Sequence, residues 1–562
     1  MFLPTTKKEL TQLGWECLDV IIVTGDTYLD SPYIGAAVIG KILLQAGYKV
    51  GIIAQPELEN QEIARLGEPS LFWGVTSGSV DSMVANYTAT KKRRQQDDFT
   101  PGGINNRRPD RAVLAYTNLI RRHFKNTVPI VLGGIEASLR RIAHYDYWGN
   151  ELRRSILLDA KANYLVYGMG EKTILQLAEK LKQNQPCTEI RGLCYIDQNP
   201  RLDYLELPSF PSVKADKYEF IKMFHLFYQQ QDPFSSKGLC QQQDTRYLIH
   251  NPPQFPLTQI ELNQVYELDY ERNVHPYYRS DGAVRALETI RFSITTHRGC
   301  YGECNFCSIA MHQGRLVHSR SEASIIKEVE ALTKLPDFKG YLLDVGGPTA
   351  NMYGVDCETK KTHGACTAKR CLFPRTCKNL PFNHEKQLHL LQRLRRLPGI
   401  KKIFIASGIR YDLILNDSKS GLEYLREIMK YHLSGQMKIA PEHTEDKILK
   451  LMGKPNRAAL QKFREHFNQI KQQNNQEQFL TYYFIAAHPG TEQHEMEQLH
   501  QFAVRELKLC PEQVQIFTPL PSTYSTLMYY TGLDPFTLKP LYVEKDQHRK
   551  ELQKQAVIGK RK

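Results

Sequence analysis

The chain has 562 residues, of which 41% are hydrophobic and 24% are charged, and its net charge is +14. This length exceeds what one hydrophobic core usually supports, so we expect two or three domains. No apolar run approaches the roughly 20 residues that a membrane-spanning helix needs, and the first residues lack the apolar core of a signal peptide. The composition argues against a membrane protein and predicts a cytoplasmic one, whose twelve cysteines are free thiols or metal ligands rather than disulfides.

The positive charge gathers in three short runs: "KKRR" at residues 91–94, "NNRRPDR" at 105–111 and "GKRK" at 559–562. Basic runs permit a polyanionic partner such as RNA. They are also common as solvated loops, and charge alone does not separate the two interpretations.

Residues 1–190 alternate apolar strand-like runs with helical stretches. The predicted strands lie at residues 19–25, 48–56, 71–78, 128–134 and 162–171. Continuous apolar strands alternating with helices indicate a parallel sheet that is covered on both faces. We therefore predict an α/β, Rossmann-like (cobalamin-binding-like) domain.

The carboxyl ends of these strands read "TGD", "TSGS", "GGIEAS" and "GMGE". Ligands of open parallel sheets bind at such ends, although a glycine there also serves a tight turn. No G-x-G-x-x-G follows the first strand, which disfavours a dinucleotide. A binding crevice and simple turns both remain open.

Residues 191–284 are rich in Pro, Gln and Ser and predict an irregular connector. A second alternation follows, with strands expected at residues 291–299, 340–348, 401–412, 435–443, 479–490 and 513–522. Six strand–helix repeats predict a partial (β/α)6 barrel over residues 285–540, whose active site would lie at the carboxyl ends of the strands. Residues 541–562 are expected to be a basic tail.

The segment "THRGCYGECNFCSIAMHQGR" follows the first of these strands and carries Cys300, Cys304 and Cys307 in the spacing C-x3-C-x2-C. Three thiolates in a glycine-containing loop can hold three irons of a cubic cluster and leave the fourth iron open. The alternatives are three buried cysteines that act as small hydrophobic residues, and a zinc knuckle completed by His297 or His312.

This cysteine pattern, with an aromatic Phe306 before the last cysteine, resembles the radical S-adenosylmethionine (radical SAM) superfamily over residues 285–530. The resemblance implies a 4Fe–4S cluster that reductively cleaves S-adenosyl-L-methionine (SAM) and generates a 5′-deoxyadenosyl radical. The cofactors would supply the difficult chemistry, and the protein would position them.

The resemblance also implies which strand ends bind SAM. "DVGGPT" is similar to the glycine pair that meets the methionine amino group, with Gly346 and Gly347 matching and Pro348 in place of the usual acidic residue. The further expected contacts come from "ASGIRYD", "KIAPEH" and "AAHPGT" and are Ser407, Arg410, Lys438 and His488. Glu442 and His443 belong to the same strand end as Lys438. Local turn contacts are the alternative for each residue.

A second group of cysteines, Cys357, Cys366, Cys371 and Cys377, lies in an insertion at residues 351–380. Four thiolates fit a tetrahedral zinc ion or an auxiliary iron–sulfur cluster. Reduced structural thiols are the alternative, because the spacing matches no common zinc-finger pattern.

Over residues 1–545, "GGIEASLRRIAHYDYW" and "DVGGPTANMYG" resemble the YgiQ family of radical SAM proteins. The resemblance implies a reductant such as flavodoxin or ferredoxin, and it permits an RNA or protein substrate. The first domain is also similar to that of cobalamin-dependent radical SAM enzymes, but a D-x-H-x-x-G motif is absent, so cobalamin remains open. Methylthiotransferases carry three further cluster cysteines that this chain lacks. The alternative function is a non-catalytic iron–sulfur or zinc protein that binds nucleic acid through the basic loops.

Overall fold

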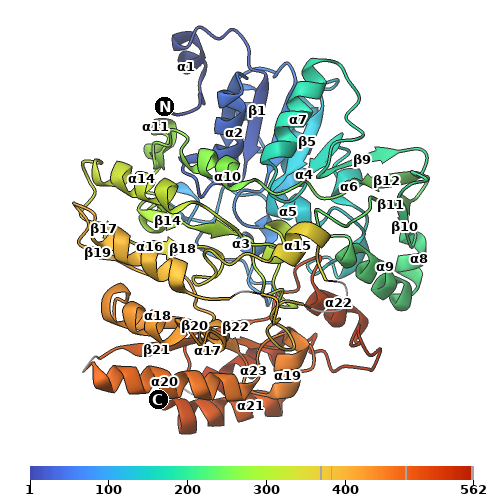
Figure 1. The fold of residues 1–562 in the computed structure, drawn as a ribbon. Coiled ribbons are helices and arrows are strands. Elements are labelled where there is room, and N and C mark those ends of the chain that lie inside the picture. The colour runs from blue at the N-terminus through green and yellow to red at the C-terminus, as the bar shows by residue number, and fades with distance from the viewer. Residues whose placement is uncertain (367–369, 381, 475–476, 559–562) are drawn as a thin grey trace. The chain divides into compact units, whose positions relative to one another are not determined.

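The computed structural model describes residues 1–366, 370–380, 382–474 and 477–558, which form two compact units (Figure 1). Unit 1 comprises Met1–Leu257 with Gln264–Arg291, and unit 2 comprises Thr258–Asn263 with Phe292–Lys562. The sequence placed the start of the second domain at residue 285, a few residues before the observed division. No helix in the described part of the chain is both long and apolar enough to cross a membrane.

Unit 1 is built on a nine-stranded sheet with the order β10-β11-β12-β9-β8-β5-β4-β1-β3. The half from β3 to β8 is parallel, as predicted. Its strands are β1 (Val20–Thr24), β3 (Val50–Ala54), β4 (Phe72–Thr76), β5 (Ile130–Gly133) and β8 (Tyr164–Val166). Every residue of β1 and β3 is buried, because helices cover both faces of the sheet.

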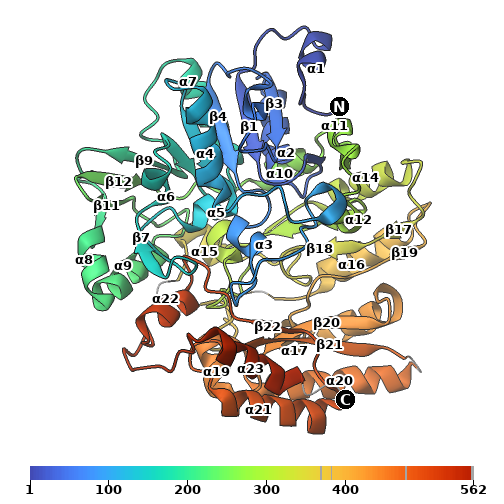
Figure 2. The ribbon, with the colours of Figure 1, turned by 180° about the vertical axis from the view of Figure 1, so that it is seen from behind.

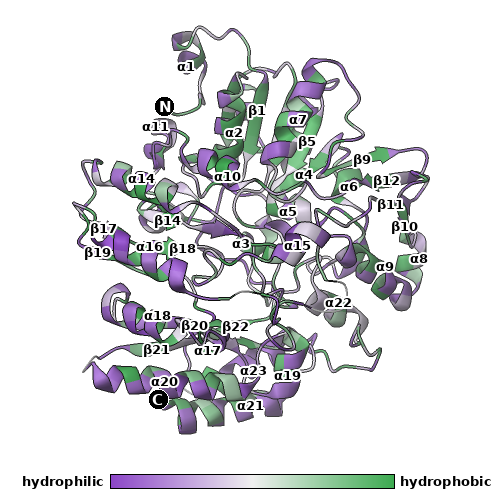
Figure 3. Ribbon diagram, viewed as in Figure 1, coloured by the Kyte–Doolittle hydropathy of each residue, from purple (hydrophilic) through white to green (hydrophobic). Residues whose placement is uncertain are grey.

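The covering helices present apolar stripes to the sheet. Helices α2 (Gly35–Gln45) and α7 (Glu171–Lys182) lie on the face toward the viewer in Figure 1, and α4 (Ala112–His123) lies in front in Figure 2. On α4 the buried residues Val113, Tyr116 and Ile120 recur at helical spacing. Figure 3 shows the same division, with hydrophobic strands under helices that are hydrophilic on their outer faces.

Residues 191–284 contain regular structure where the sequence predicted an irregular connector. Strands β9 (Leu193–Asp197), β10 (Leu205–Leu207), β11 (Leu239–Gln243) and β12 (Arg246–His250) extend the sheet, accompanied by α8 (Phe210–Ala215) and α9 (Lys217–Gln229). The polar run "LCQQQ" is strand β11, and its buried glutamines accept hydrogen bonds. Gln241 accepts from the Ala143 N–H and Gln243 from the Ser155 N–H. These long-range contacts stabilise a strand that composition alone does not indicate.

Unit 2 is a succession of parallel strands, each paired with the next in the chain, which matches the predicted partial barrel. The strands are β14 (Ser293–Thr295), β17 (Tyr341–Leu342) continued by β18 (Asp344–Gly346), β19 (Lys402–Ile403), β20 (Gln436–Glu442), β21 (Phe479–Ala486) and β22 (Val514–Ile516). The crossovers include α14 (Glu322–Thr333), α16 (Glu385–Arg395), α18 (Gly421–Glu427), α20 (Arg457–Gln473) and α21 (Gln493–Phe502). All carboxyl ends therefore lie at one edge of the strands.

Candidate active site

The three cysteines lie on the loop between β15 (His297–Arg298) and α13 (Ile309–His312), beyond the carboxyl end of β14. Gly299 starts the loop at φ +83°, and a Cβ there would lie 2.0 Å from the carbonyl oxygen of Leu316, so the turn requires glycine. All three thiols are free and half-buried. The Cys307 N–H donates to the Cys304 carbonyl at 3.0 Å, which folds the last two cysteines into one turn.

The chemistry of these thiols suits metal binding. Desolvation raises the pKa of Cys300, and it raises the pKa of Cys307 to about 12. Burial therefore disfavours a free thiolate at Cys300 and Cys307, and a bound metal would offset that cost. Among the described residues, no group of three or more His, Cys, Asp or Glu side chains meets around a single ion. A cubic cluster binds each thiolate to a different iron, so its ligands need not converge on one point.

Arg410 brings a fixed positive charge to this loop. It precedes α17 (Tyr411–Asn416), and its Nη1 donates to Sγ of Cys304 at 3.6 Å. The other edge of the guanidinium is bidentate to Asp412, with Nε–Oδ1 at 3.0 Å and Nη2–Oδ2 at 2.7 Å. Burial would lower the pKa of Arg410, but Asp412 and the thiols outweigh it and raise the pKa well above its ordinary value. Arg410 therefore stays charged, as a site for an anionic cluster requires.

A buried chain of polar groups fixes the backbone of Arg410. Asn351 accepts from the Arg410 N–H at 2.9 Å and donates to the Arg410 carbonyl at 3.0 Å. The Asn351 amide also lies 3.2 Å from Nε2 of His384, whose Nδ1 lies 2.7 Å from Asp417. Burial lowers the pKa of His384, so the ring is neutral and donates from Nδ1 while accepting at Nε2. Asp417 thus sets the tautomer that lets Asn351 hold Arg410.

The predicted glycine pair and Ser407 lie together at two neighbouring strand ends. A Cβ on Gly346 would be 3.7 Å from Oγ of Ser407, and Ser407 is itself bonded to Asp344 through its N–H and hydroxyl. A Cβ on Gly347 would be 2.6 Å from Nε2 of His297. That nitrogen is buried and has no hydrogen-bond partner in the described part of the chain. Gly346 is buried and its carbonyl accepts from Thr296, whereas Gly347 is half-buried and leaves no room for a side chain beside His297.

At the end of β20, Lys438 is half-buried and Glu442 is strained. Glu442 has φ +71° at a register shift of the strand and is only 9% exposed. Its carboxylate pairs with Lys454 at 3.7 Å, which is a long contact for a buried ion pair. Burial raises the pKa of Glu442 to about 7. A buried, poorly paired carboxylate on strained backbone is typical of a functional site.

The remaining predicted SAM contacts, His488 and Phe306, are buried or half-buried. His488 is 1% exposed, and its ring nitrogens lie 2.9 Å from the Pro489 carbonyl and 2.7 Å from Oγ of Ser525. It therefore has the bonding of a satisfied structural histidine. Phe306 is half-buried between Cys304 and Cys307. His443, which follows Glu442 in the chain, has a buried Nε2 without a hydrogen-bond partner in the part of unit 2 that is described.

The structure brings three cysteines of the second group to one apolar cluster and leaves the fourth exposed. Cys357 and Cys371 are buried in an apolar cluster with Tyr301, Cys377 packs against that cluster, and Cys366 is exposed. Burial raises the pKa of Cys371 to about 11. Residues 367–369 of the insertion lie outside the described part. Binding of a metal by these four cysteines stays a prediction.

The insertion also supplies contacts that the sequence did not indicate. Lys360 lies 3.4 Å from Glu303 and donates to the Arg315 carbonyl at 2.8 Å. Arg370 donates to the Glu303 carbonyl at 2.9 Å and to the Asn305 side chain at 2.6 Å. Basic residues of the insertion therefore bind the cysteine loop and hold it in place.

The basic runs of unit 1 are engaged within the unit. Arg93 pairs with Asp110 at 3.7 Å, Arg107 pairs with Asp281 at 2.9 Å, and Arg111 pairs with Asp146. Arg108 is fully buried. Lys92 and Arg94 of the first run remain exposed, so the four arginines that are paired or buried account for only part of the basic charge.

The buried chain behind Arg410 leads to a stability prediction. Burial would raise the pKa of Asp417, but hydrogen bonds from His384 and Ser420 outweigh it and lower the pKa below its ordinary value. Its stabilising contribution is therefore present above about pH 4 and is lost as the pH falls through the lowered pKa. We expect Asp417→Asn to cost about 1–3 kcal/mol at pH 7 and less below pH 4.

Thermal midpoints of wild type and variant, measured at pH 7 and at the lowest pH that keeps the chain folded, test this prediction. The exposed neighbour Ser418 provides the control substitution Ser418→Ala, which should leave the midpoint unchanged. Equal midpoints for wild type and Asp417→Asn at pH 7 would contradict the assigned role.

Comparison with known proteins matches each of the two units to a protein family. Residues 2–293 match the family described as Radical SAM N-terminal, and residues 294–503 match the Radical SAM superfamily. A UPF0313 protein of Fusobacterium nucleatum is 59% identical over 100% of this chain and 99% of its own length.

Solved structures with a similar fold are radical SAM enzymes. TsrM, a radical S-adenosylmethionine methyltransferase from Kitasatospora setae, is similar with a TM-score of 0.50 at 15% identity, over 89% of this chain and 74% of that one. OxsB, a cobalamin-dependent S-adenosylmethionine radical enzyme, is similar with a TM-score of 0.50 at 14% identity, over 90% of this chain and 54% of that one. At these identities the similarity shows the fold, with a cobalamin-binding-like first domain followed by a radical SAM domain. With the full-length match to its Fusobacterium relative, the chain belongs to the UPF0313 family of radical SAM proteins and is a radical SAM enzyme.

Proposed function

We propose that Cys300, Cys304 and Cys307 hold the 4Fe–4S cluster of this enzyme, with Arg410 beside it. The observation that carries the assignment is the contact between Arg410 and Cys304 at 3.6 Å, made by an arginine whose backbone and guanidinium are both fixed. A fixed cation next to the thiolates offsets part of the negative charge of a bound cluster. When bound, the cluster supplies one electron that cleaves SAM to methionine and a 5′-deoxyadenosyl radical.

SAM would bind along the strand ends of unit 2. Gly347 is half-buried and Gly346 lies beside Ser407, so this strand end offers backbone and a hydroxyl group that suit a small ligand with amino and carboxylate groups. Glu442 is the best-placed anion, because it is buried and pairs with Lys454 at 3.7 Å, so that a bound donor group would give it a closer partner. Lys438 and Phe306 stay proposed contacts on half-buried positions. His488, whose nitrogens are engaged, would support the turn rather than bind the ligand directly.

We further propose the conditions in which the enzyme works. An acidic one-electron donor such as flavodoxin or ferredoxin complements a net charge of +14. The twelve cysteines are free thiols in the structure, which suits the reducing cytoplasm. The substrate is an RNA, a protein or a smaller molecule, and identifying it requires the radical to be generated first.

The first prediction concerns the cluster. After anaerobic reconstitution and reduction with dithionite, we expect the wild type to bind about four irons per cluster and to form 5′-deoxyadenosine from SAM. The triple variant Cys300→Ala/Cys304→Ala/Cys307→Ala should form none. Iron content and chromatography of the products measure both outcomes.

A matched control is Cys17→Ala/Cys510→Ala, which removes two exposed thiols and should leave iron and 5′-deoxyadenosine unchanged. Residual iron of about four per chain in the triple variant would place a second cluster on the insertion cysteines. A wild type that binds zinc and leaves SAM intact would overturn the proposal.

The second prediction concerns Glu442. We expect Glu442→Gln to lower the rate of 5′-deoxyadenosine formation by about tenfold or more, because a hydrogen bond to a charged acceptor contributes about 1.5–3 kcal/mol. The thermal midpoint should stay unchanged or rise, because the variant removes a buried, poorly paired carboxylate.

Glu423 is exposed, so Glu423→Gln makes the same change of charge away from the site and should keep the wild-type rate. A lower midpoint for Glu442→Gln together with the wild-type rate would assign Glu442 a structural role instead.

A further inference from the structure

The sheet of unit 1 has one position where ligands of doubly wound folds bind. In chain order, its parallel strands follow the arrangement 2-1-3-4-5, because β3 lies on one side of β1, and β4, β5 and β8 lie on the other. The connection reverses direction between β1 and β4, and ligands of such sheets bind in the crevice outside the carboxyl ends at that point. The residues that follow β1 and β4 therefore decide whether a cofactor enters.

Those two strand ends are in direct contact. The Gly25 N–H donates to the Thr76 carbonyl at 3.1 Å, and a Cβ on Gly25 would lie 2.2 Å from the carbonyl oxygen of Ser77. Gly78 has φ +98°, and a Cβ there would lie 2.1 Å from the Asp26 carboxylate. Both glycines are thus needed for the chain to pack against itself, which leaves no gap between the two loops.

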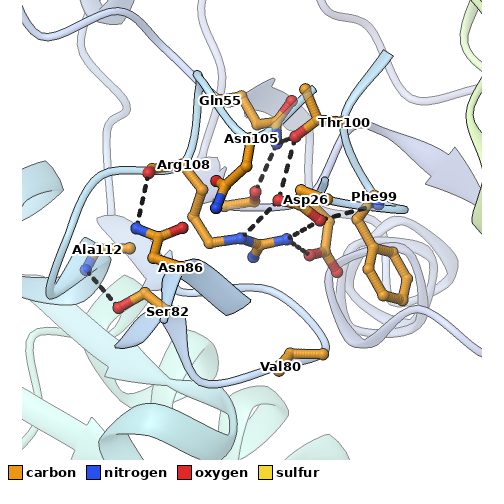
Figure 4. A network of polar contacts seen from close by, with 12 residues as sticks. Asp26, Gln55, Val80, Ser82, Asn86, Phe99, Thr100, Asn105, Arg108 and Ala112 are labelled. Atoms are coloured by element: carbon orange, nitrogen blue, oxygen red, sulfur yellow. Dashed lines mark hydrogen bonds and ion pairs between the residues drawn. The ribbon is translucent and has the colours of Figure 1, made fainter. Parts of the chain in front are cut away.

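Arg108 closes the remaining space. Its guanidinium pairs with Asp26 at 2.9 Å and with Asp97 at 3.0 Å, and it donates to the Ser77 carbonyl (Figure 4). Asp26 also accepts from the Ser79 N–H at 2.6 Å. The side chains of Arg108 and Asp26 are 0% exposed. An arginine from the loop before α4 therefore joins the two strand ends at the point where the crevice would open.

A second layer of hydrogen bonds holds these groups. Gln55, which follows β3, donates to the Gly25 carbonyl at 2.9 Å and to the Thr100 hydroxyl at 2.7 Å. Thr100 donates to Asp97 at 3.1 Å, and Thr27 donates to Gln55 at 3.1 Å. The network joins the ends of β1 and β3 to the segment that carries Asp97. Opening the crevice would break all of these contacts and leave buried charged groups without partners.

We infer that this network is a permanent closure of the crevice and that the enzyme uses SAM without cobalamin. The fold implies a cobalamin-binding-like domain, but the residues at its ligand-binding edge do not fit a corrinoid or its nucleotide tail. The charged residues at this edge, Arg108, Asp26 and Asp97, pair with one another and are buried. Unit 1 therefore retains the architecture of a cofactor domain with the cofactor position taken by its own Arg108.

The first experiment measures cobalamin retention by the full-length, cluster-reconstituted wild type. The protein is incubated anaerobically with excess hydroxocobalamin and desalted, and bound cobalamin is read from its visible absorption, with OxsB treated in parallel as the positive control. We expect retention close to zero, and the same yield of 5′-deoxyadenosine with and without added hydroxocobalamin. Retention of one cobalamin per chain would overturn the inference, whatever the result of the SAM-cleavage assay.

A second experiment tests the closure itself. Ser77 is buried at the crevice and Ser79 is exposed two residues later, so Ser77→Cys and Ser79→Cys form a matched pair of small substitutions. Labelling with a maleimide, read by peptide-resolved mass spectrometry, should be about tenfold or more slower at position 77 than at position 79. Equal rates in a chain whose thermal midpoint matches the wild type would show an open crevice and overturn the inference.

Discussion

The cysteine loop depends on one buried arginine. Arg410 reaches Cys304 at 3.6 Å while both of its backbone groups are bonded to Asn351 and its guanidinium is bonded to Asp412. None of these partners is adjacent to the cysteines in the chain. The fold of unit 2 brings them together because the strand ends of a parallel barrel share one edge. A charge held this firmly can stabilise an anionic cluster without reorganising when one binds.

The two units use a buried arginine in opposite ways. Arg108 in unit 1 is bonded to Asp26 and Asp97 and has no exposed surface, so its charge is neutralised inside the unit. Arg410 in unit 2 has one carboxylate partner and directs its remaining donor toward a thiol. The difference lies in the remaining donors of each guanidinium, since Arg108 uses them on a second carboxylate and the Ser77 carbonyl, whereas Arg410 keeps one for Cys304. In the sequence, Arg108 stood only in a basic run, whereas Arg410 was expected at a strand end from the family resemblance.

Two residues near the candidate site have a strained backbone conformation. Glu303 and Glu442 have positive φ values of 45° and 71°, and they lie on the cysteine loop and at the end of β20. Neither residue is of a type that favours this conformation, so the surrounding contacts must hold it. For Glu303 these contacts come from Lys360 and Arg370 of the insertion. The insertion therefore has a structural role in holding the cysteine loop, independent of any metal it binds.

The sequence by itself determined the parallel strands of both units and the position of the three cysteines, because buried parallel strands are continuous apolar runs and C-x3-C-x2-C is a local pattern. It did not predict strand β11, whose glutamines are stabilised only by distant backbone groups. It also could not show that Asp417 acts on Arg410 through His384 and Asn351, or that Asp26, Asp97 and Arg108 meet. A polar residue can bind a ligand, hold another residue in place or fill a crevice, and its burial and its partners decide which of these it does. Only the tertiary structure sets burial and partners, because the partners come from segments far apart in the chain.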